Sequence, residues 1–372
     1  MPSPQSYTGE DSFEIYCHGG KSTMESFFET LANIENVRFA NEGEFTKRAL
    51  INGKINLIKA EAINDLVYSE TEEQRVLAIK QLNKGLTIPI TEWKKILKKS
   101  MAKVESSIDF SDEADVPESL NIIEDLVSLK KEFEKVLNQS ECFEMIKTGT
   151  KVVLTGRPNA GKSSIFNTIL KTKKAIVTNI PGTTRDIIEG AVNLKGYPVI
   201  FYDTAGINKT NNPVEKEGIR RARELIKKAD LVLNVIDAND FNDNEINSNY
   251  WNVINKTDIK AINLSSFYKR NKIFNISAIS GKGMDLLLEK IFEHIRYKTN
   301  VIANTATFLS SARQKDLLLK ALNSVNLAIN ENSEELIAEH LRSINTNLGR
   351  ILGEVDIEEV LGEIFSNFCI GK

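Results

Sequence analysis

The 372 residues are too many for one ordinary hydrophobic core, so the length predicts two or three domains. A net charge of -3 excludes a global positive field, so any contact with RNA must come from local basic patches or from a partner. The three cysteines (Cys17, Cys142 and Cys369) lie far apart without C-x-x-C spacing, which argues against a disulfide framework or a zinc site. Because no signal peptide and no run of about 18 apolar residues is visible, we expect a cytoplasmic protein.

Residues 1–50 are mixed and rich in glycine, serine and aromatic residues, and they look too small to hold a core. Within them SFEIYCHGG (12–20) predicts a strand that runs into a glycine turn, because aromatic and β-branched residues favour strands. His18 in this stretch is interpreted as a structural residue beside the turn rather than as a catalytic one.

Residues 51–147 have the apolar spacing of helices, as in INLIKAEAINDLVYSE (55–70). Pro89 and Pro117 interrupt the pattern, so we expect about three long helices. The acidic stretch DFSDEADVPESL (109–120) is interpreted as a helix start and a solvated loop, not as a catalytic pair of carboxylates.

Residues 148–298 change to short apolar runs that alternate with helical stretches. The runs are KVVLTG, PVIFYDTAG, ADLVLNVID, WNVINKTD and KIFNISA. Such alternation predicts a mostly parallel sheet flanked by helices. The helical period returns in residues 299–372, so the fold class we expect is an α/β P-loop domain inserted in an all-α helical domain, whose halves pack together.

The stretch GRPNAGKS, Gly156 to Ser163, lies between a predicted strand and a predicted helix and fits the pattern G-x-x-x-x-G-K-[ST]. In that context backbone N–H groups and a helix N-terminus can surround a phosphate, whereas a bare match could be a chance glycine loop. Lys162 is expected to reach the β- and γ-phosphates, and Ser163 to ligate magnesium.

A second motif, DTAG, follows the phosphate loop, and the segment GTTRD precedes DTAG. DTAG ends an apolar strand, so Asp203 is placed to hold magnesium through its water shell and Gly206 to present its N–H to the γ-phosphate. Between the motifs lies GTTRD, in which Thr184 is a candidate for the second magnesium hydroxyl. By themselves, a D-x-x-G turn and a loop threonine are ordinary features, so both assignments depend on their neighbours.

The motifs NKTD (255–258) and SAI (277–279) contain the residues expected to select the base. A carboxylate at Asp258 accepts both N1–H and N2–H of guanine but meets a lone pair at N1 of adenine. Asn255 and the stem of Lys256 are expected to support the purine, and Ala278, after Ser277, to give its N–H to the guanine O6. The four motifs in order predict GTP rather than ATP.

The position after DTAG holds Ile207, whose side chain cannot orient a water molecule as the glutamine of many small GTPases does. Hydrolysis is therefore slow, or another group positions the water. Glu215 and Glu217 are acidic candidates, and a carboxylate at a helix start is an equally good interpretation from the residues alone.

These residues together resemble the tRNA-modification GTPase family MnmE, also called TrmE, over nearly the whole chain. The marks are YTGED, CHGG, GEFTKRALINGKINLIKAEA, GRPNAGKSS, PGTTRD, DTAG and the terminal CIGK. The resemblance implies a homodimer that works with the flavoprotein MnmG (GidA), as a heterotetramer, to add a carboxymethylaminomethyl-type group at C5 of the wobble uridine, U34, of certain tRNAs. The GTP-binding residues it leads us to expect are Asn159, Ala160, Gly161, Lys162, Ser163, Ser164, Thr178, Asn179, Ile180, Pro181, Gly182, Thr183, Thr184, Asp203, Thr204, Ala205, Gly206, Asn255, Lys256, Asp258, Ser277 and Ala278.

The resemblance also implies a potassium-activated GTPase, in which potassium replaces an arginine finger. Its expected ligands are the Asn159 side chain, backbone oxygens at Thr178 and Ile180, and Thr183. Glu215 matches the family glutamate that orients water, which accounts for Ile207.

A one-carbon tetrahydrofolate, 5,10-methylene or formyl, is the further ligand that the resemblance implies. Glu14, Lys54 and the terminal Lys372 match family positions around it, so FCIGK is expected to fold back toward the N-terminal part. Cys369 is a weaker candidate for a nucleophile, and a packed or exposed thiol is at least as good an interpretation.

The chain departs from the family pattern in two places. The chain begins almost at YTGED, so we expect an N-terminally shortened member whose residues 1–50 are a remnant of the folate-binding domain. Only FNDNEINSNYW separates the strand LVLNVID from VINKTD, where the family has a full helix. We expect the shorter connection to expose one side of the sheet.

Two alternatives stay open from the sequence. One is a GTPase switch of the ribosome-assembly type, and the other is a decayed homologue that binds GTP without supporting modification. The basic clusters KKILKK and IRRAR are interpreted as solvated helix faces rather than as tRNA contacts.

Overall fold

The computed structural model describes residues 1–83, 85–109, 122–173, 175–176, 188–204, 213–262, 272–300, 307–355, 365 and 368. The chain divides into two compact units. The helical unit comprises Met1–Tyr68, Ala78–Asn138 and Ala306–Lys372, and the sheet unit comprises Ser69–Leu77 and Gln139–Thr305. Within the described ranges, no helix is long and apolar enough to cross a membrane.

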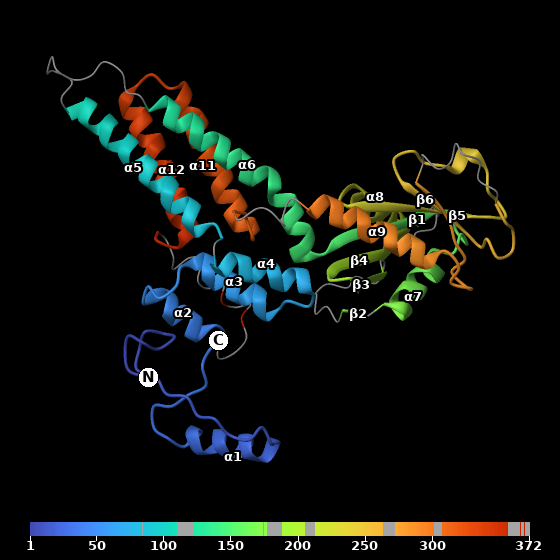
Figure 1. The fold of residues 1–372 in the computed structure, drawn as a ribbon, viewed down its shortest axis with the longest axis horizontal. Helices are drawn as coiled ribbons and strands as arrows, with labels where there is room; N and C mark the ends of the chain where they lie inside the picture. Colours follow the sequence, from blue (N-terminus) through green and yellow to red (C-terminus); the bar gives the residue numbers. More distant parts are fainter. Residues whose placement is uncertain are drawn as a thin grey trace. The chain divides into compact units, whose positions relative to one another are not determined.

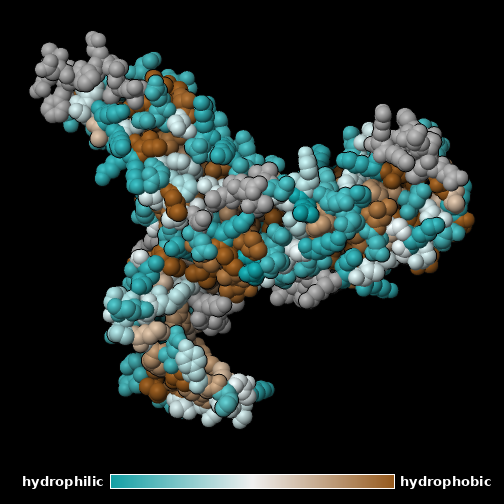
Figure 2. All heavy atoms as spheres, viewed as in Figure 1, coloured by the Kyte–Doolittle hydropathy of each residue, from teal (hydrophilic) through white to brown (hydrophobic). Residues whose placement is uncertain are grey.

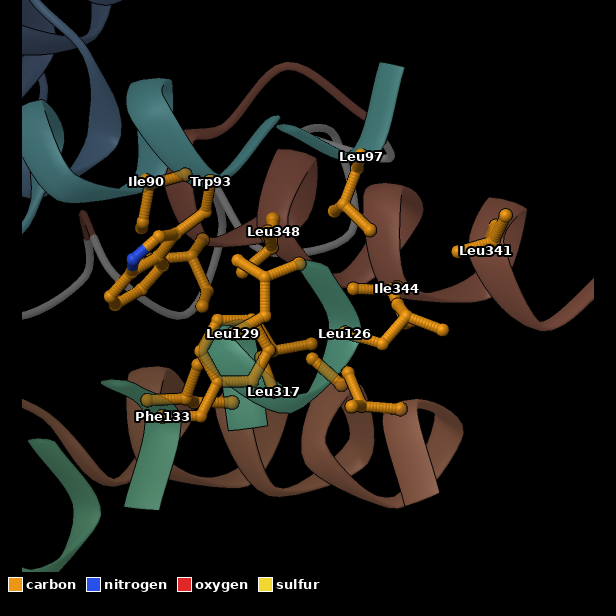
Figure 3. Close-up of a cluster of buried hydrophobic side chains, with 14 of the residues drawn as sticks. Ile90, Trp93, Leu97, Leu126, Leu129, Phe133, Leu317, Leu341, Ile344 and Leu348 are labelled. Carbon is orange, nitrogen blue, oxygen red and sulfur yellow. The ribbon is translucent and has the colours of Figure 1, made fainter. Parts of the chain in front are cut away.

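The helical unit is built around one bundle core. Its helices are α1 (Lys21–Ala32), α2 (Glu44–Ile51), α3 (Leu57–Val67), α5 (Thr87–Asp109), α11 (Ala312–Asn330) and α12 (Glu334–Leu352), together with parts of α4 (Glu72–Asn83) and α6 (Ile123–Thr148). Leucine and isoleucine side chains of α5, α6, α11 and α12 interdigitate in the core, where the rings of Trp93 and Phe133 lie 4.8 Å apart (Figure 3). Helices that precede the strands in the sequence and helices that follow them therefore share one hydrophobic core.

The predicted break at Pro89 is confirmed, since α4 ends at Asn83 and α5 begins at Thr87. Pro89 lies in the first turn of α5, where its missing N–H costs no helical hydrogen bond. A further break, which was not predicted, occurs at Thr71, just before α4 begins. The Thr71 N–H donates to Gln74 Oε1 at 3.0 Å, and the Gln74 N–H donates to Thr71 Oγ1 at 3.5 Å. This reciprocal capping pair divides the first expected helix into α3 and α4. Most of the acidic stretch 109–120 lies outside the described residues.

The predicted strand at SFEIYCHGG is also wrong, since residues 11–20 form neither a strand nor a helix. A strand needs a neighbour for its backbone hydrogen bonds, and no strand of the described chain pairs with this segment. Phe13 and Tyr16 are accordingly 77% and 88% exposed. Tan and brown atoms gather on the part of the surface that belongs to α1 in Figure 2, in keeping with the absence of buried residues on that helix.

The sheet unit holds a seven-stranded sheet in the order β2-β3-β4-β1-β5-β6-β7 (Figure 1). Its strands are β1 (Thr150–Gly156), β2 (Ala175–Ile176), β3 (Ile188–Leu194), β4 (Tyr197–Asp203), β5 (Leu231–Asp237), β6 (Trp251–Asn255) and β7 (Ile273–Asn275). The strands from β4 to β7 in that order are parallel, which confirms the five predicted strands, whereas β2 and β3 add an antiparallel edge. Helices α7 (Lys162–Thr172) and α9 (Met284–Thr299) bury their apolar residues against one face.

The opposite face is not left exposed by the short connection between β5 and β6. Val153 and Ile254 on this face are 0% exposed, and Ile236 is 3% exposed, so that expectation is wrong for these side chains. Residues 238–250 contain no α-helix, only the 3₁₀ turn Asp243–Glu245. Asparagine side chains of the two strands bind this connection to the sheet, as described below.

The last described residues of the chain pack against α2 and α3 within the helical unit. Phe365 and Phe368, both 4% exposed, join Leu50, Leu57 and Ala60 in a small apolar cluster. Gly43, at the N-terminus of α2, has a φ of 62°, and a Cβ added there would lie 2.5 Å from Phe365 Cδ1. The described part of the tail therefore folds back as expected, whereas Cys369 and Lys372 lie outside the described residues.

We expect Gly43→Ala to destabilise the helical unit more than Gly53→Ala. Gly53 has a φ of 66°, but nothing lies within 4 Å of its added Cβ, so that variant carries only the backbone cost of about 1–2 kcal/mol. Gly43→Ala adds overpacking against the tail phenylalanine, about 1–3 kcal/mol more. Chemical denaturation measures both free energies of unfolding, and equal losses would contradict the tail contact.

Candidate nucleotide-binding site

The phosphate loop, defined here as residues 156–163, connects β1 to α7 and is pressed against the neighbouring strands. Gly156 has a φ of 139°, and a Cβ added there would lie 2.1 Å from the carbonyl oxygen of Val235 on β5. Gly161 has a φ of 94°, and its added Cβ would lie 2.2 Å from Nδ2 of Asn255 on β6. Both positions require glycine for backbone conformation and for space.

Lys162 is buried, and its ammonium lies within the turn of the loop. Its Nζ donates to the carbonyl oxygens of Gly156 at 3.0 Å and Arg157 at 2.9 Å. Burial lowers the pKa of Lys162, and the carboxylate of Asp203 opposes that shift. The backbone carbonyl groups of the loop thus hold the Lys162 ammonium at the place where the motif is expected to bind phosphate oxygens.

The side chain of Asn255 joins three motifs that are far apart in the sequence. Its Nδ2 donates to the carbonyl oxygen of Ala160 at 3.0 Å, and its Oδ1 accepts the Ala278 N–H at 3.0 Å. Thr168 of α7 donates its hydroxyl to the Ala278 carbonyl, also at 3.0 Å. The phosphate loop, NKTD and SAI therefore meet at one point, although a bond from Ala278 to guanine O6 would have to share or exchange the bond to Asn255.

Lys256 follows with a φ of 66°, and an ion pair holds its end. The Nζ of Lys256 lies 2.5 Å from Oδ2 of Asp237, the last residue of β5. Partial burial raises the pKa of Asp237, but the hydrogen bonds from Lys256 and Asn239 outweigh it, so the net shift is downward. Asp237 is not among the residues predicted from the sequence, although an aspartate that ends the apolar run LVLNVID is a signal for it. Asp258, two residues after Lys256, is exposed.

The expected magnesium ligands that the structure describes fit the ion's chemistry. Asp203 ends β4 directly beside Leu154 of β1, and it is 2% exposed. The Thr204 hydroxyl donates to the Leu154 carbonyl at 2.7 Å, which fixes the chain just after the carboxylate. Ser163 is exposed in the first turn of α7. A hydroxyl and a carboxylate are oxygen donors, as magnesium prefers.

Many of the expected site residues lie outside the described part of the chain. These are Thr178, Asn179, Ile180, Pro181, Gly182, Thr183, Thr184, Ala205 and Gly206. Glu215 falls in the first turn of α8 (Pro213–Lys227), and its side chain is likewise outside the described part. Asn159 is exposed in the phosphate loop with a φ of 63°.

The expected folate residues are bound to local partners. Glu14 accepts the Tyr16 hydroxyl at 2.5 Å, and Lys54 donates to the Pro4 carbonyl at 2.6 Å. Both side chains are exposed, and the contacts found here do not join them to each other.

Comparison with known proteins places both units in one family. A family model described as the MnmE helical domain matches residues 57–369, and one described as the GTP-binding protein TrmE N-terminus matches residues 1–54. The tRNA modification GTPase MnmE of Rhodopseudomonas palustris (strain ATCC BAA-98 / CGA009) is 38% identical over 377 residues, which cover 100% of this chain and 85% of that protein. The protein of the same name from Bartonella henselae is 36% identical over 382 residues, covering 100% and 86%.

Among solved structures, the G domain of the T. maritima FeoB iron transporter is 30% identical and covers 39% of this chain and 98% of its own. Its TM-score of 0.30 is too low to support a structural argument.

We expect Asn255→Ala to loosen the sheet unit by about 1–3 kcal/mol, because it leaves the Ala160 carbonyl and the Ala278 N–H buried without this partner. The matched control is Asn275→Ala, which removes one exposed hydrogen bond to the Ile262 carbonyl and should cost no more than about 0.5 kcal/mol. Native-state amide exchange of β1, β5 and β6 in the full chain measures the difference. Equal protection in the two variants would contradict a bridging role for Asn255.

Proposed function

The chain belongs to the MnmE family of tRNA modification GTPases, and on this premise we propose that it hydrolyses GTP in the modification of tRNA. The observation that carries the proposal is the Asn255 amide, which holds the phosphate loop, NKTD and SAI at one point. Those three loops bring together a phosphate cradle and a carboxylate suited to guanine. We propose Asp258 as the group that selects guanine, since it is exposed and follows Asn255 by three residues in NKTD.

The magnesium and potassium sites are proposed from the motifs and the family. Ser163 and Thr184 would hold magnesium, with Asp203 acting through the water shell. Asn159, Thr178, Ile180 and Thr183 would hold potassium, and the exposed amide of Asn159 in the phosphate loop supports that choice. A potassium ion held there would supply positive charge to the phosphate oxygens, and Glu215 in the first turn of α8 would orient the water.

The proposed reaction has a partner and a defined target. We infer that the chain works as a homodimer with the flavoprotein MnmG and that the pair adds a carboxymethylaminomethyl-type group at C5 of the wobble uridine. Glu14, Lys54 and Lys372 would contact a tetrahydrofolate derivative. The packing of Phe365 and Phe368 on α2 and α3 supports a tail that returns to the N-terminal part.

The domain organisation is part of the same proposal. We infer that residues 148–298 are a GTP-binding domain inserted in a helical domain formed by residues 51–147 and 299–372. Residues 1–50 would belong to the folate-binding domain. The core shared by α5, α6, α11 and α12 supports the pairing of the two helical segments.

Removal of the gene should abolish the modification at the wobble uridine, and the unchanged gene should restore it. Lys162→Ala should fail to restore it, because the ammonium within the phosphate loop is lost. Mass spectrometry of wobble nucleosides from purified tRNA measures both results. Unchanged modification after removal would instead favour a ribosome-assembly switch or a decayed homologue, and restoration by Lys162→Ala would show that GTP chemistry is not required.

Potassium should accelerate GTP hydrolysis by the purified chain on the order of tenfold or more over sodium at equal ionic strength, because it supplies the charge of an arginine finger. Asn159→Ala should remove most of this difference while hydrolysis in sodium changes little. A control with ATP should show no potassium-dependent turnover. Equal rates in the two salts would contradict the potassium site, and a preference for ATP would contradict the choice of guanine.

A further inference from the structure

We propose that Glu245, in the short connection between β5 and β6, is a positioning residue that fixes the phosphate loop through Arg157. The inference rests on the proposed binding of GTP and adds a residue to that site. It concerns a part of the chain that carries none of the nucleotide motifs. All the contacts that support it lie within the sheet unit.

The connection is bound to the sheet by two asparagine side chains. Asn234 and Asn252 lie opposite each other in the register of β5 and β6, and Asn234 Nδ2 donates to Asn252 Oδ1 at 3.0 Å. Asn234 also donates to the Glu245 carbonyl at 2.8 Å. Asn252 accepts the Asn247 N–H at 3.0 Å and donates to the Asn247 carbonyl at 2.9 Å. The backbone around Glu245 is therefore held at a defined place over the sheet.

An ion pair joins this anchored segment to the phosphate loop. Oε1 of Glu245 lies 2.6 Å from Nη1 of Arg157, and the Glu245 side chain is only 12% exposed. That oxygen is shielded from solvent and has no hydrogen-bond partner, so its contact with Arg157, whose side chain is 71% exposed, is an ion pair without a hydrogen bond. Removing Arg157 would leave this shielded carboxylate without its counter-charge, which costs more than the loss of a fully exposed pair.

The backbone of Arg157 connects this ion pair to Lys162, the residue expected to contact phosphate. Its carbonyl oxygen accepts a hydrogen bond from Lys162 Nζ at 2.9 Å. It also accepts the Ala160 N–H at 3.4 Å, and Ala160 in turn is bound by Asn255. A continuous series of contacts thus runs from β5 through Glu245 and Arg157 to the Lys162 ammonium. A loop held in this way loses less conformational freedom when a phosphate binds.

The test measures the affinity of the full chain for a fluorescent guanine nucleotide at low ionic strength. Glu245→Gln and Arg157→Gln should each weaken binding by about threefold to tenfold, as loss of a partly buried ion pair implies. The double variant should be no weaker than either single variant, because both remove the same contact. The difference from the unchanged chain should shrink at high ionic strength.

The matched control is Glu289→Gln, which removes the exposed ion pair between Glu289 and Lys195 in the same unit. It should leave nucleotide affinity unchanged. Because a single variant can lower affinity by disturbing the fold, the charge reversal Arg157→Glu with Glu245→Arg provides a second measurement. It should restore much of the affinity that each reversal alone removes.

Affinities of Glu245→Gln equal to those of the control, additive losses in the double variant, or no restoration by charge reversal would each overturn the role of Glu245. These outcomes leave the proposed function standing. Absence of guanine nucleotide binding by the unchanged chain would overturn the proposed function and the role of Glu245 together.

Discussion

The buried amide of Asn255 is the contact on which the candidate site depends. It must donate to the Ala160 carbonyl and accept from the Ala278 N–H at the same time. An aspartate cannot donate, and an apolar side chain of similar shape can do neither, so only an amide satisfies both buried groups. Gly161 is required for the same reason, because any Cβ there would occupy the place of the amide nitrogen. One side chain thereby determines the spacing of three loops.

Asparagine side chains also bind the connection between β5 and β6 to the sheet. A short polar connection has little apolar surface with which to cover a sheet face. The paired Asn234 and Asn252 bind its backbone instead, and they satisfy polar groups that a helix would have satisfied internally. Val153 and Ile254 on this face of the sheet are buried. The same connection brings a carboxylate to the phosphate loop, so its attachment to the sheet and its proposed positioning role come from one set of contacts.

The helical unit depends on contacts between segments that are far apart in the chain. Its main core combines α5 and α6, which come before the strands in the sequence, with α11 and α12, which come after them. A buried polar contact accompanies the apolar packing, since Glu61 of α3 accepts from Arg313 Nε at 2.9 Å and is 8% exposed. Arg313 also donates to the Arg350 carbonyl near the end of α12. Arg313 of α11 therefore contacts both α3 and α12, and it satisfies a carbonyl group at the C-terminus of α12.

Local chemistry determined the parts of this protein that could be predicted from the sequence. Apolar runs gave the strands from β1 to β7 that lie in the parallel part of the sheet, and the order of four motifs indicated a guanine nucleotide, because a phosphate loop requires glycine and lysine at set spacing. The capping pair Thr71 and Gln74 was equally local and was overlooked, as was the hairpin at Lys195 and Gly196, whose φ values of 53° and 97° suit a two-residue turn. Only the tertiary structure decided that FEIY has no partner strand, that the tail phenylalanines require Gly43, and that Glu245 contacts Arg157. The reason is that sequence patterns report what each segment prefers by itself, whereas these outcomes depend on which distant group lies within a few ångströms.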